Sequence, residues 1–183
     1  MIPLSPVNLS PSTLKVTTMP EVSGLIDYGD GVSVRPSVHA DALHIGNNMR
    51  QADRDEMFAL LGETNMVKVV TRQITSCTEC YTILKNDRPI AVFGLCEMEM
   101  GIASIGLLST DELLSIKLKF MRQCKKWVKS FNADYNLLFN VVGCENLLHV
   151  TWLKWLGFTF LRRIPGHGKS GEDFYEFARL KEA

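Results

Sequence analysis

The sequence lacks an excess of charge of either sign. Twenty lysine and arginine residues balance twenty aspartate and glutamate residues in a chain of 183, so the formal net charge is zero. A neutral chain has no overall field that would draw it onto nucleic acid or an anionic membrane, so any such binding has to come from a local patch. With 46% hydrophobic and 22% charged residues, the composition is that of a folded globular chain of about one domain.

Long apolar runs are absent as well. No uninterrupted stretch approaches the roughly 18 apolar residues that a membrane-spanning helix needs. The opening residues, MIPLSPVNLS, have neither the basic start nor the apolar stretch of a secretory signal. We therefore expect no membrane span and a cytosol-like compartment.

Cysteine and histidine are too few and too scattered to predict a metal site or a hydrolase. Of the five cysteines, only Cys77 and Cys80, in CTEC, have metal-like spacing. A structural zinc ion usually needs four ligands, and no second Cys or His pair accompanies this one. We expect no metal and free thiols, and the histidines show no Ser, His and Asp order of a catalytic triad. The remaining residues of these two types are Cys96, Cys124, Cys144, His39, His44, His149 and His167.

Residues 1–31 differ in composition from the rest. They hold four of the seven prolines and few charges. Proline removes backbone donors and fixes φ, so this segment is predicted to be an extended arm that precedes a domain at 32–183. An arm that docks on a partner would suggest an assembly.

The rest of the chain predicts a mixed α/β fold. Period-two and period-3.6 patterns alternate along it, and Asn86, Asp87 and Arg88 form a polar turn between two β-rich runs. Three strands in succession then make an antiparallel meander. Gly157 is predicted to end a helix in the left-handed conformation, with Phe158 packing back on Leu153. The expected strands are 32–38, 80–85, 89–99, 102–108, 135–143, 158–164 and 173–180, and the expected helical segments are 39–62, 111–131 and 144–156.

This order of elements resembles the GNAT acetyltransferase fold over residues 32–180. NLLHVTWLKWLGF is similar to that family's fourth-helix signature, an Asn followed eleven and twelve residues later by Gly-Phe, here Asn146, Gly157 and Phe158. VRPSVHADA likewise resembles the family's usual opening. The resemblance implies a mixed, mostly antiparallel central sheet flanked by helices.

The resemblance also implies where acetyl-CoA would bind. In active members a loop patterned R/Q-x-x-G-x-G/A opens the long helix, and its N–H groups hold the pyrophosphate. Here that junction reads GLLSTDELLSIK, with no such pattern and no glycine between Leu107 and Gly143. Ser109 and Glu112 have the spacing of a capping box, which would satisfy the first donors of the helix. Asp111 and Glu112 would also repel phosphate, so we expect a closed site and no cofactor.

The catalytic residues implied by the resemblance are missing too. Active members often place a Tyr seven residues after the signature Asn as general acid, and this chain has Leu153 there. Glu97 and Glu99 are available as bases, but they alternate with neighbouring residues as on a solvent-facing strand. No catalytic residue is therefore assigned.

With loop and acid both absent, the sequence most resembles one subset of the fold, the GNAT-like internal virion protein A of short-tailed phages. That subset also runs from the meander into a helix started by Ser/Thr-Asp, and it keeps an Asn, His, Phe-Leu-Lys and Gly segment. Asn146, His149, WLKWLG and Gly157 are similar to it. The longer arm departs from this subset. The resemblance implies a virion-associated or assembly protein, found in the virion and host cytoplasm, with other virion or assembly proteins as partners.

Two functions stay open, and a third has no residue signature. The first is a non-catalytic virion or assembly scaffold that contacts partners through the arm and the basic face of the long helix. That face also fits a solvated surface, and nucleic-acid binding is not expected because no exposed aromatics are interleaved with it. The third is a small-ligand sensor or an inhibitor of host machinery. The basic face comprises Lys119, Arg122, Lys126 and Lys129.

The second open function is an acetyl-CoA-dependent N-acetyltransferase with an atypical cofactor loop. In that case Gly106 and the backbone of Leu107 and Leu108 would separate from the next strand and hold the pantetheine. Asn146 is the remaining candidate cofactor contact, and a water molecule would replace the missing acid.

Overall fold

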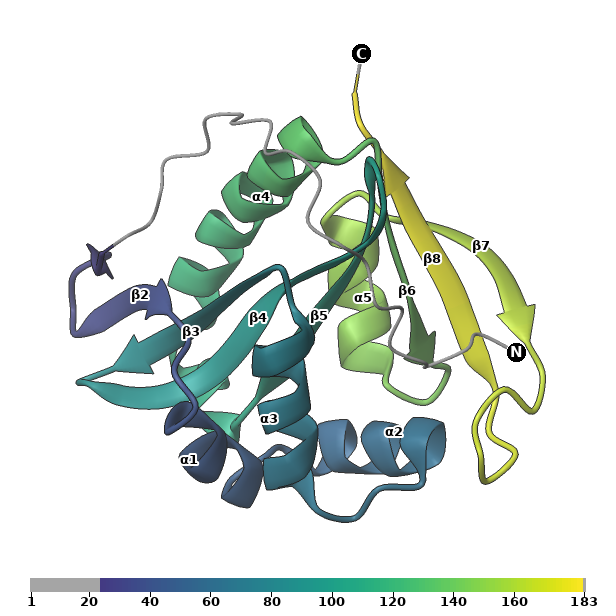
Figure 1. The fold of residues 1–183 in the computed structure, drawn as a ribbon, viewed down its shortest axis with the longest axis horizontal. Coiled ribbons are helices and arrows are strands. Elements are labelled where there is room, and N and C mark those ends of the chain that lie inside the picture. Colours follow the sequence, from purple (N-terminus) through teal and green to yellow (C-terminus); the bar gives the residue numbers. More distant parts are fainter. Residues whose placement is uncertain (1–23, 183) are drawn as a thin grey trace, which may run out of the picture.

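One eight-stranded sheet runs through the molecule, with helices on both faces (Figure 1). A computed structural model describes residues 24–182. The strand order is β1-β2-β3-β4-β5-β6-β8-β7. The strands are β1 (Ile26–Asp27), β2 (Val32–Pro36), β3 (Glu79–Lys85), β4 (Arg88–Glu99), β5 (Ile102–Ser109), β6 (Leu137–Gly143), β7 (Thr159–Ile164) and β8 (Phe174–Leu180). The helices are α1 (Asp41–Asn47), α2 (Gln51–Leu61), α3 (Met66–Ser76), the 3₁₀ segment η1 (Asp111–Ile116), α4 (Lys117–Asp134) and α5 (Leu147–Trp155).

The predicted mixed, mostly antiparallel sheet is confirmed. Strands β3, β4 and β5 form the expected meander, and Asn86 and Asp87 make the β3–β4 turn with positive φ. The pair β5–β6 is parallel, because α4 crosses over between these strands. This pair is also short, since only Ile102, Ala103 and Ser104 pair with β6. Beyond Ser104 the two strands separate.

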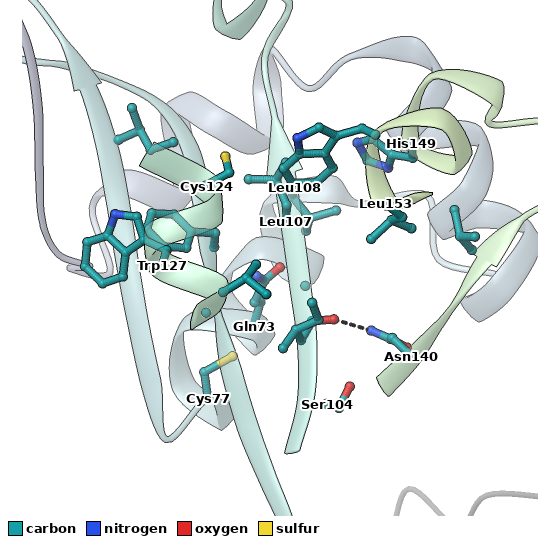
Figure 2. A pocket seen from close by; sticks show the side chains of 18 of the residues that line it. Gln73, Cys77, Ser104, Leu107, Leu108, Cys124, Trp127, Asn140, His149 and Leu153 are labelled. Carbon is teal, nitrogen blue, oxygen red and sulfur yellow. Dashed lines mark hydrogen bonds between the residues drawn. The ribbon is translucent and has the colours of Figure 1, made fainter. Parts of the chain in front are cut away.

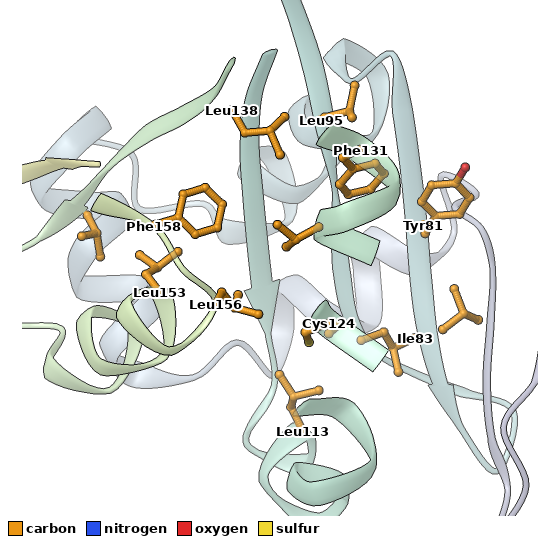
Figure 3. Close-up of a cluster of buried hydrophobic side chains, with 14 of the residues drawn as sticks. Tyr81, Ile83, Leu95, Leu113, Cys124, Phe131, Leu138, Leu153, Leu156 and Phe158 are labelled. Atoms are coloured by element: carbon orange, nitrogen blue, oxygen red, sulfur yellow. The ribbon is translucent and has the colours of Figure 1, made fainter. Parts of the chain in front are cut away.

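Two apolar clusters cover the two faces of the sheet. Ala91 and Val92 are neighbours on β4 and belong to different clusters, as alternating strand residues do. Helices α4 and α5 pack on the face of Ala91, where Phe131 and Leu153 meet the sheet (Figure 3). Helices α1 and α3 pack on the opposite face, that of Val92.

The end of α5 follows its prediction. Gly157 has φ +87°, and the Phe158 amide donates to the Leu153 carbonyl at 3.1 Å. The Gly157 amide donates to the Lys154 carbonyl at 3.1 Å, which completes a Schellman ending. Phe158 and Leu153 are both buried.

The start of the long helix differs from its prediction. The α-helix begins at Lys117, and residues 111–116 form a 3₁₀ segment instead. Ser109 is the last residue of β5, and its hydroxyl interacts with Asp53 at 3.3 Å. The predicted capping box is therefore wrong, because Glu112 pairs with Arg88 rather than with the helix end.

Part of the predicted arm joins the sheet. Residues 26 and 27 form β1, which pairs with β2. Lys119 of α4 fastens the following turn, because its Nζ donates to the Tyr28 and Gly29 carbonyls at 3.0 and 2.7 Å and to Asp30 at 2.6 Å. Residues 1–23 of the arm lie outside the described residues. In residues 24–182, none of the helices combines the length and apolarity that crossing a bilayer requires.

Candidate functional site

A cavity of about 390 Å³ lies where β5 and β6 separate. Asn140 of β6 reaches across the gap, and its Nδ2 donates to the Ile105 carbonyl at 2.5 Å. Figure 2 shows Trp127 of α4 on one side of the cavity and Leu153 of α5 on the other, with Leu107 of β5 between them. The wall is largely apolar, as in many small-molecule sites.

Sequence-predicted residues occupy part of this wall. Gly106, Leu107 and Leu108 line the cavity, on the stretch of β5 that has no partner on its β6 side. A Cβ at Gly106 would lie 3.6 Å from Gln73 Nε2, so the Gln73 amide faces this strand (Figure 2). That Nε2 is buried and has no hydrogen-bond partner among the described residues. The separated strand edge and this amide are the polar features that a ligand in the cavity would meet.

A buried ion pair contacts the last residue of β5. Arg50 and Asp53 lie at the start of α2, one turn apart, and their side chains meet at 2.5 Å. Asp53 is 1% exposed and also accepts the Ser109 amide at 3.2 Å. The Arg50 amide in turn donates to the Ser109 carbonyl at 2.9 Å, and Met49 bridges to Thr110. The start of α2 is therefore fixed against the last residues of β5 by backbone and charge.

Three further polar residues, Glu56, Asn146 and His149, extend from this ion pair toward the cavity, and together with Arg50 and Asp53 they form the polar cluster. Asn146 Nδ2 lies 2.6 Å from Glu56 Oε2 and 3.1 Å from His149 Nδ1. His149 Nε2 lies 3.1 Å from Arg50 Nη2 and 3.7 Å from Asp53 Oδ1. Glu56 and His149 both line the cavity, so the cluster joins the cavity to the buried ion pair.

Burial shifts the titration of both cavity-facing groups. It raises the pKa of Glu56 to about 7, with the charge of Asp53 adding to the rise and the hydrogen bond from Asn146 opposing it. Burial also lowers the pKa of His149, because it disfavours the imidazolium, while Asp53 opposes this change. Near neutral pH the cluster thus holds a neutral imidazole and a carboxyl group that titrates in this pH range.

As the Asn146 amide is placed, it donates to an ionised Glu56, and the opposite orientation of the amide would fit a protonated Glu56. A neutral imidazole accepts at only one nitrogen, yet donors face both nitrogens of His149, from Arg50 and from Asn146. Rotating the Asn146 amide by half a turn would place its oxygen against His149 Nδ1–H. The same oxygen would then face Glu56 at 2.6 Å and would need a proton on that carboxyl group.

Solved structures share this arrangement of strands and helices. A GNAT-family acetyltransferase from Bacillus anthracis matches with a TM-score of 0.64 at 12% identity, covering 87% of this chain and 100% of that one. Ard1 from Thermoplasma volcanium matches with a TM-score of 0.64 at 12% identity, over 84% and 99% of the two chains. The ribosomal-protein-S18-alanine N-acetyltransferase from Escherichia coli matches with a TM-score of 0.60 at 11% identity, over 83% and 95%.

The chain has the GNAT acetyltransferase fold. No protein-family model matches the chain, and no curated protein matches it. At these identities the likeness shows the GNAT fold and does not carry the activity of those enzymes.

The junction between β5 and α4 corresponds to the position where the GNAT resemblance places a cofactor pyrophosphate. The Ser109 amide is taken by Asp53 and the Thr110 amide by the Ile90 carbonyl. The first turn of α4 contains no acidic residue, so the expectation that Asp111 and Glu112 stand in its first turn is wrong. They lie just upstream, in η1.

The other predicted residues fall into two groups. Leu153, at the general-acid position of the GNAT resemblance, is buried and lines the cavity. Asn146 is buried in the polar cluster, where it contacts Glu56 and His149. Glu97 and Glu99 are exposed at the far end of β4 and do not line the cavity.

The four basic residues of the α4 face differ in exposure. Lys119 is held by the turn after β1, with its side chain 27% exposed. Arg122, Lys126 and Lys129 are exposed. The face therefore offers three cations to a partner, and the fourth serves the fold.

Arg50, Asp53, Glu56 and His149 were not predicted as site residues. The sequence holds a partial signal, because Arg50, Asp53 and Glu56 follow at intervals of three on one helix. It does not show that this helical face meets His149 from α5.

Proposed function

We propose that this chain is a non-catalytic protein that uses the GNAT fold as a scaffold in an assembly, as a virion-associated protein similar to internal virion protein A. The observation that carries the proposal is the carboxylate of Asp53 on the Ser109 amide, at the junction where an acetyl-CoA enzyme needs free N–H groups. Three further observations support it: the buried Arg50 pair, the acidic η1 segment and the apolar residue at the acid position.

Charge disfavours a phosphate at this junction. A pyrophosphate there would approach the buried Asp53 carboxylate and the side chain of Asp111, whereas Glu112 is paired with Arg88. Two like charges a few ångströms apart repel by a few kcal/mol at an effective dielectric constant of about 20. Arg50 neutralises much of the Asp53 charge through their ion pair. The main obstacle at Ser109 is therefore that its amide is already bonded, and the repulsion comes chiefly from Asp111 in η1.

The acid position argues in the same direction. Leu153 is buried between the sheet and α5 and has no proton to donate to a departing thiolate. Trp152 is adjacent but stacks on Phe120 of α4 with a ring separation of 5.4 Å. This stack helps to join α4 to α5, which is a structural role.

The virion-associated part of the proposal rests on the sequence resemblance. Its partners are other virion or assembly proteins, and its location is the virion and the host cytoplasm. Arg122, Lys126 and Lys129 form the exposed part of the contact surface, and the proline-containing arm is the other contact segment.

The particle-associated role has a direct test. If the encoding gene lies among those for portal, tail and internal virion proteins, purified particles should contain the chain at a constant ratio to the portal protein in quantitative mass spectrometry. Particles that lack the chain would refute the proposal. A triple replacement of Arg122, Lys126 and Lys129 by glutamine should lower that ratio if the basic face contacts the assembly. A matched replacement of the exposed Lys68, on α3, should leave it unchanged.

A second candidate function is favoured by one observation, the cavity-facing Glu56 with its pKa of about 7. A carboxylate with that pKa suits a general base that takes a proton from an amine. Together with the free edge of β5, it would serve an acetyl-CoA-dependent N-acetyltransferase; among the structural relatives, the Escherichia coli enzyme is named for a protein alanine acceptor.

This second candidate is tested by acetyl transfer. Radiolabelled acetyl-CoA and a set of peptides with free N-termini should give no transfer above the rate without protein if the scaffold proposal holds. Transfer that falls at least about a hundredfold in Glu56→Gln, and not in Asp55→Asn on the same helix, would instead establish the enzyme, because a general base typically contributes about 10²–10⁴-fold.

A further inference from the structure

Three thiols gather where α3 ends and the meander begins. Cys77 is the residue that caps the C-terminal end of α3, Cys80 is on β3 and Cys96 is on β4. The Cys77 Sγ lies 2.9 Å from the Cys96 Sγ, and all five cysteines of the chain are free. Cys124 and Cys144 are buried elsewhere, on α4 and after β6.

The strand pairing brings these thiols together. At the start of β3, Glu79 pairs with Leu95 of β4. One residue earlier in the chain, Thr78 also contacts β4, because its Oγ1 accepts a hydrogen bond from the Glu97 amide at 2.9 Å. Cys96 therefore lies between two contacts with the segment that directly follows Cys77. They are 19 residues apart in sequence, and nothing in the local pattern of either segment indicates their contact.

The geometry suits a disulfide with little movement. A disulfide bond is about 2.04 Å long, so the two sulfur atoms have to approach by about 0.9 Å from their present separation of 2.9 Å. Cys77 lies at a helix end with an extended backbone, φ −72° and ψ 137°, rather than inside the helix. A side-chain rotation at such a position does not disturb helical hydrogen bonds.

The thiols can also be reached and ionised. Cys77, Cys80 and Cys96 are each only partly buried. Either thiol of the Cys77–Cys96 pair can be the donor. Contact with Cys77 lowers the pKa of Cys80 and of Cys96, and contact with Cys80 and Cys96 raises the pKa of Cys77. Since the thiolate is the nucleophile in disulfide exchange, Cys96 is suited to attack first and Cys77 to follow.

We propose that Cys77 and Cys96 form a redox-active pair that a low-molecular-weight disulfide oxidises to an intramolecular disulfide. The Cys96 thiolate attacks one sulfur of the small disulfide and releases its other half as a thiolate. The Cys77 thiolate then attacks the Cys96 sulfur of the mixed disulfide and releases the second half. In total the protein loses two thiol protons and two electrons, and the small disulfide is reduced to two thiols.

Oxidation would act on the cavity as well as on the thiols. Cys77 and Cys96 both line it, and Figure 2 shows the Cys77 sulfur pointing into it. The new bond would join the end of α3 to β4 beside Gly94, where β3 and β4 already approach closely. The pair is therefore a modification site that fixes one wall of the cavity in the oxidised state.

The test uses the full chain and oxidised glutathione. After reaction and blocking of the remaining thiols, intact mass spectrometry should show the loss of two hydrogen atoms, with three thiols still blocked. Peptide mapping should find Cys77 joined to Cys96, and dithiothreitol should restore the starting mass. Retention of all five thiols, or a disulfide joining Cys77 to Cys80, would overturn the proposal.

Two variants separate the roles of the pair. Cys77→Ser should accumulate a glutathione adduct on Cys96, because the resolving thiol is missing, whereas the wild-type chain should carry almost none. Cys124→Ser is the control and should form the disulfide as the wild type does. Equal amounts of adduct in Cys77→Ser and the wild type would contradict the assigned order of attack.

Discussion

Replacing Asp53 with asparagine removes the negative charge at the centre of the polar cluster and changes its shape very little. Asp53 is 1% exposed, and the Arg50 side chain that faces it at 2.5 Å is 8% exposed. The substitution leaves the Arg50 guanidinium buried without its counter-charge. Asparagine still offers one oxygen to the Ser109 amide, but its NH2 group then faces the Arg50 Nη2 donor, so the ion pair and its hydrogen bond are both lost.

The expected loss of stability is large. Removing one partner of a buried ion pair costs about 3–5 kcal/mol, because the remaining charge is uncompensated. Even the lower end of this range, about 3 kcal/mol, lowers Tm by roughly 6–12 °C for a chain of this size. The β5 end should loosen as well, since the Asp53 contact holds Ser109 against α2.

Urea unfolding followed by circular dichroism measures this change. Asp55→Asn is the matched control, because Asp55 lies on the same helix, is exposed and accepts a hydrogen bond from Gln51 at 2.7 Å. The control should change the free energy of unfolding by no more than about 0.5 kcal/mol. A loss below about 1 kcal/mol in Asp53→Asn would refute the reasoning that this pair is buried and structurally essential.

Three further predictions concern other parts of the fold. The pKa of Glu56 is raised from 4.5 to about 7, so between these pH values the folded chain keeps a proton that the unfolded chain loses, and the free energy of unfolding falls as pH rises. Glu56→Gln should make this decrease smaller by about 3 kcal/mol. Parallel pH profiles of the free energy of unfolding in the two chains would contradict the prediction. Gly94→Ala would place a Cβ 2.1 Å from a carbonyl oxygen of β3 and should cost at least about 2 kcal/mol in urea unfolding, whereas Gly24→Ala meets nothing within 4 Å and should be neutral. Lys119→Met should speed amide exchange in the turn after β1, and the exposed Lys126→Met should not; equal exchange in both variants would show that the lysine does not fasten this turn.

Local sequence patterns were enough for strands β2 to β8 and for the end of α5, whereas α3 (Met66–Ser76) was not predicted and the predicted helical segment 39–62 is divided into α1 and α2. The meander follows from period-two alternation around the turn at Asn86 and Asp87, and both residues adopt the positive φ that such a turn requires. Gly157 ends α5 because glycine adopts the left-handed conformation without strain, and Phe158 returns to Leu153 as expected. Each of these features is determined by residues within a few positions of each other.

Features that depend on distant partners were not predictable in this way. Asp53 and Ser109 are 56 positions apart, and Arg50 and His149 are 99 apart, so no local pattern indicates their contact. The capping box failed for the same reason. Ser109 found a partner in Asp53 from α2, and Glu112 found one outside the segment, so neither was left for the helix end.

The contacts of the thiols and of the basic face were not predictable from the sequence either. The spacing of CTEC draws attention to Cys77 and Cys80, but it does not indicate Cys96, whose sulfur lies 2.9 Å from that of Cys77. Lys119 belongs to the predicted basic face by its helical position, yet it is bonded to the turn that holds Asp30. Composition and periodicity identify such residues but do not show what they contact.

Isothermal titration calorimetry of the full chain with acetyl-CoA tests most directly the claim that protein carboxylates occupy the pyrophosphate position. The account predicts no saturable heat with the cofactor at up to about millimolar concentration, equivalent to a binding free energy weaker than about −4 kcal/mol. Saturable binding of acetyl-CoA in the micromolar range would contradict this claim. If that binding were lost in Ser109→Pro, which removes the amide that Asp53 accepts, the cofactor would lie at the junction between β5 and α4.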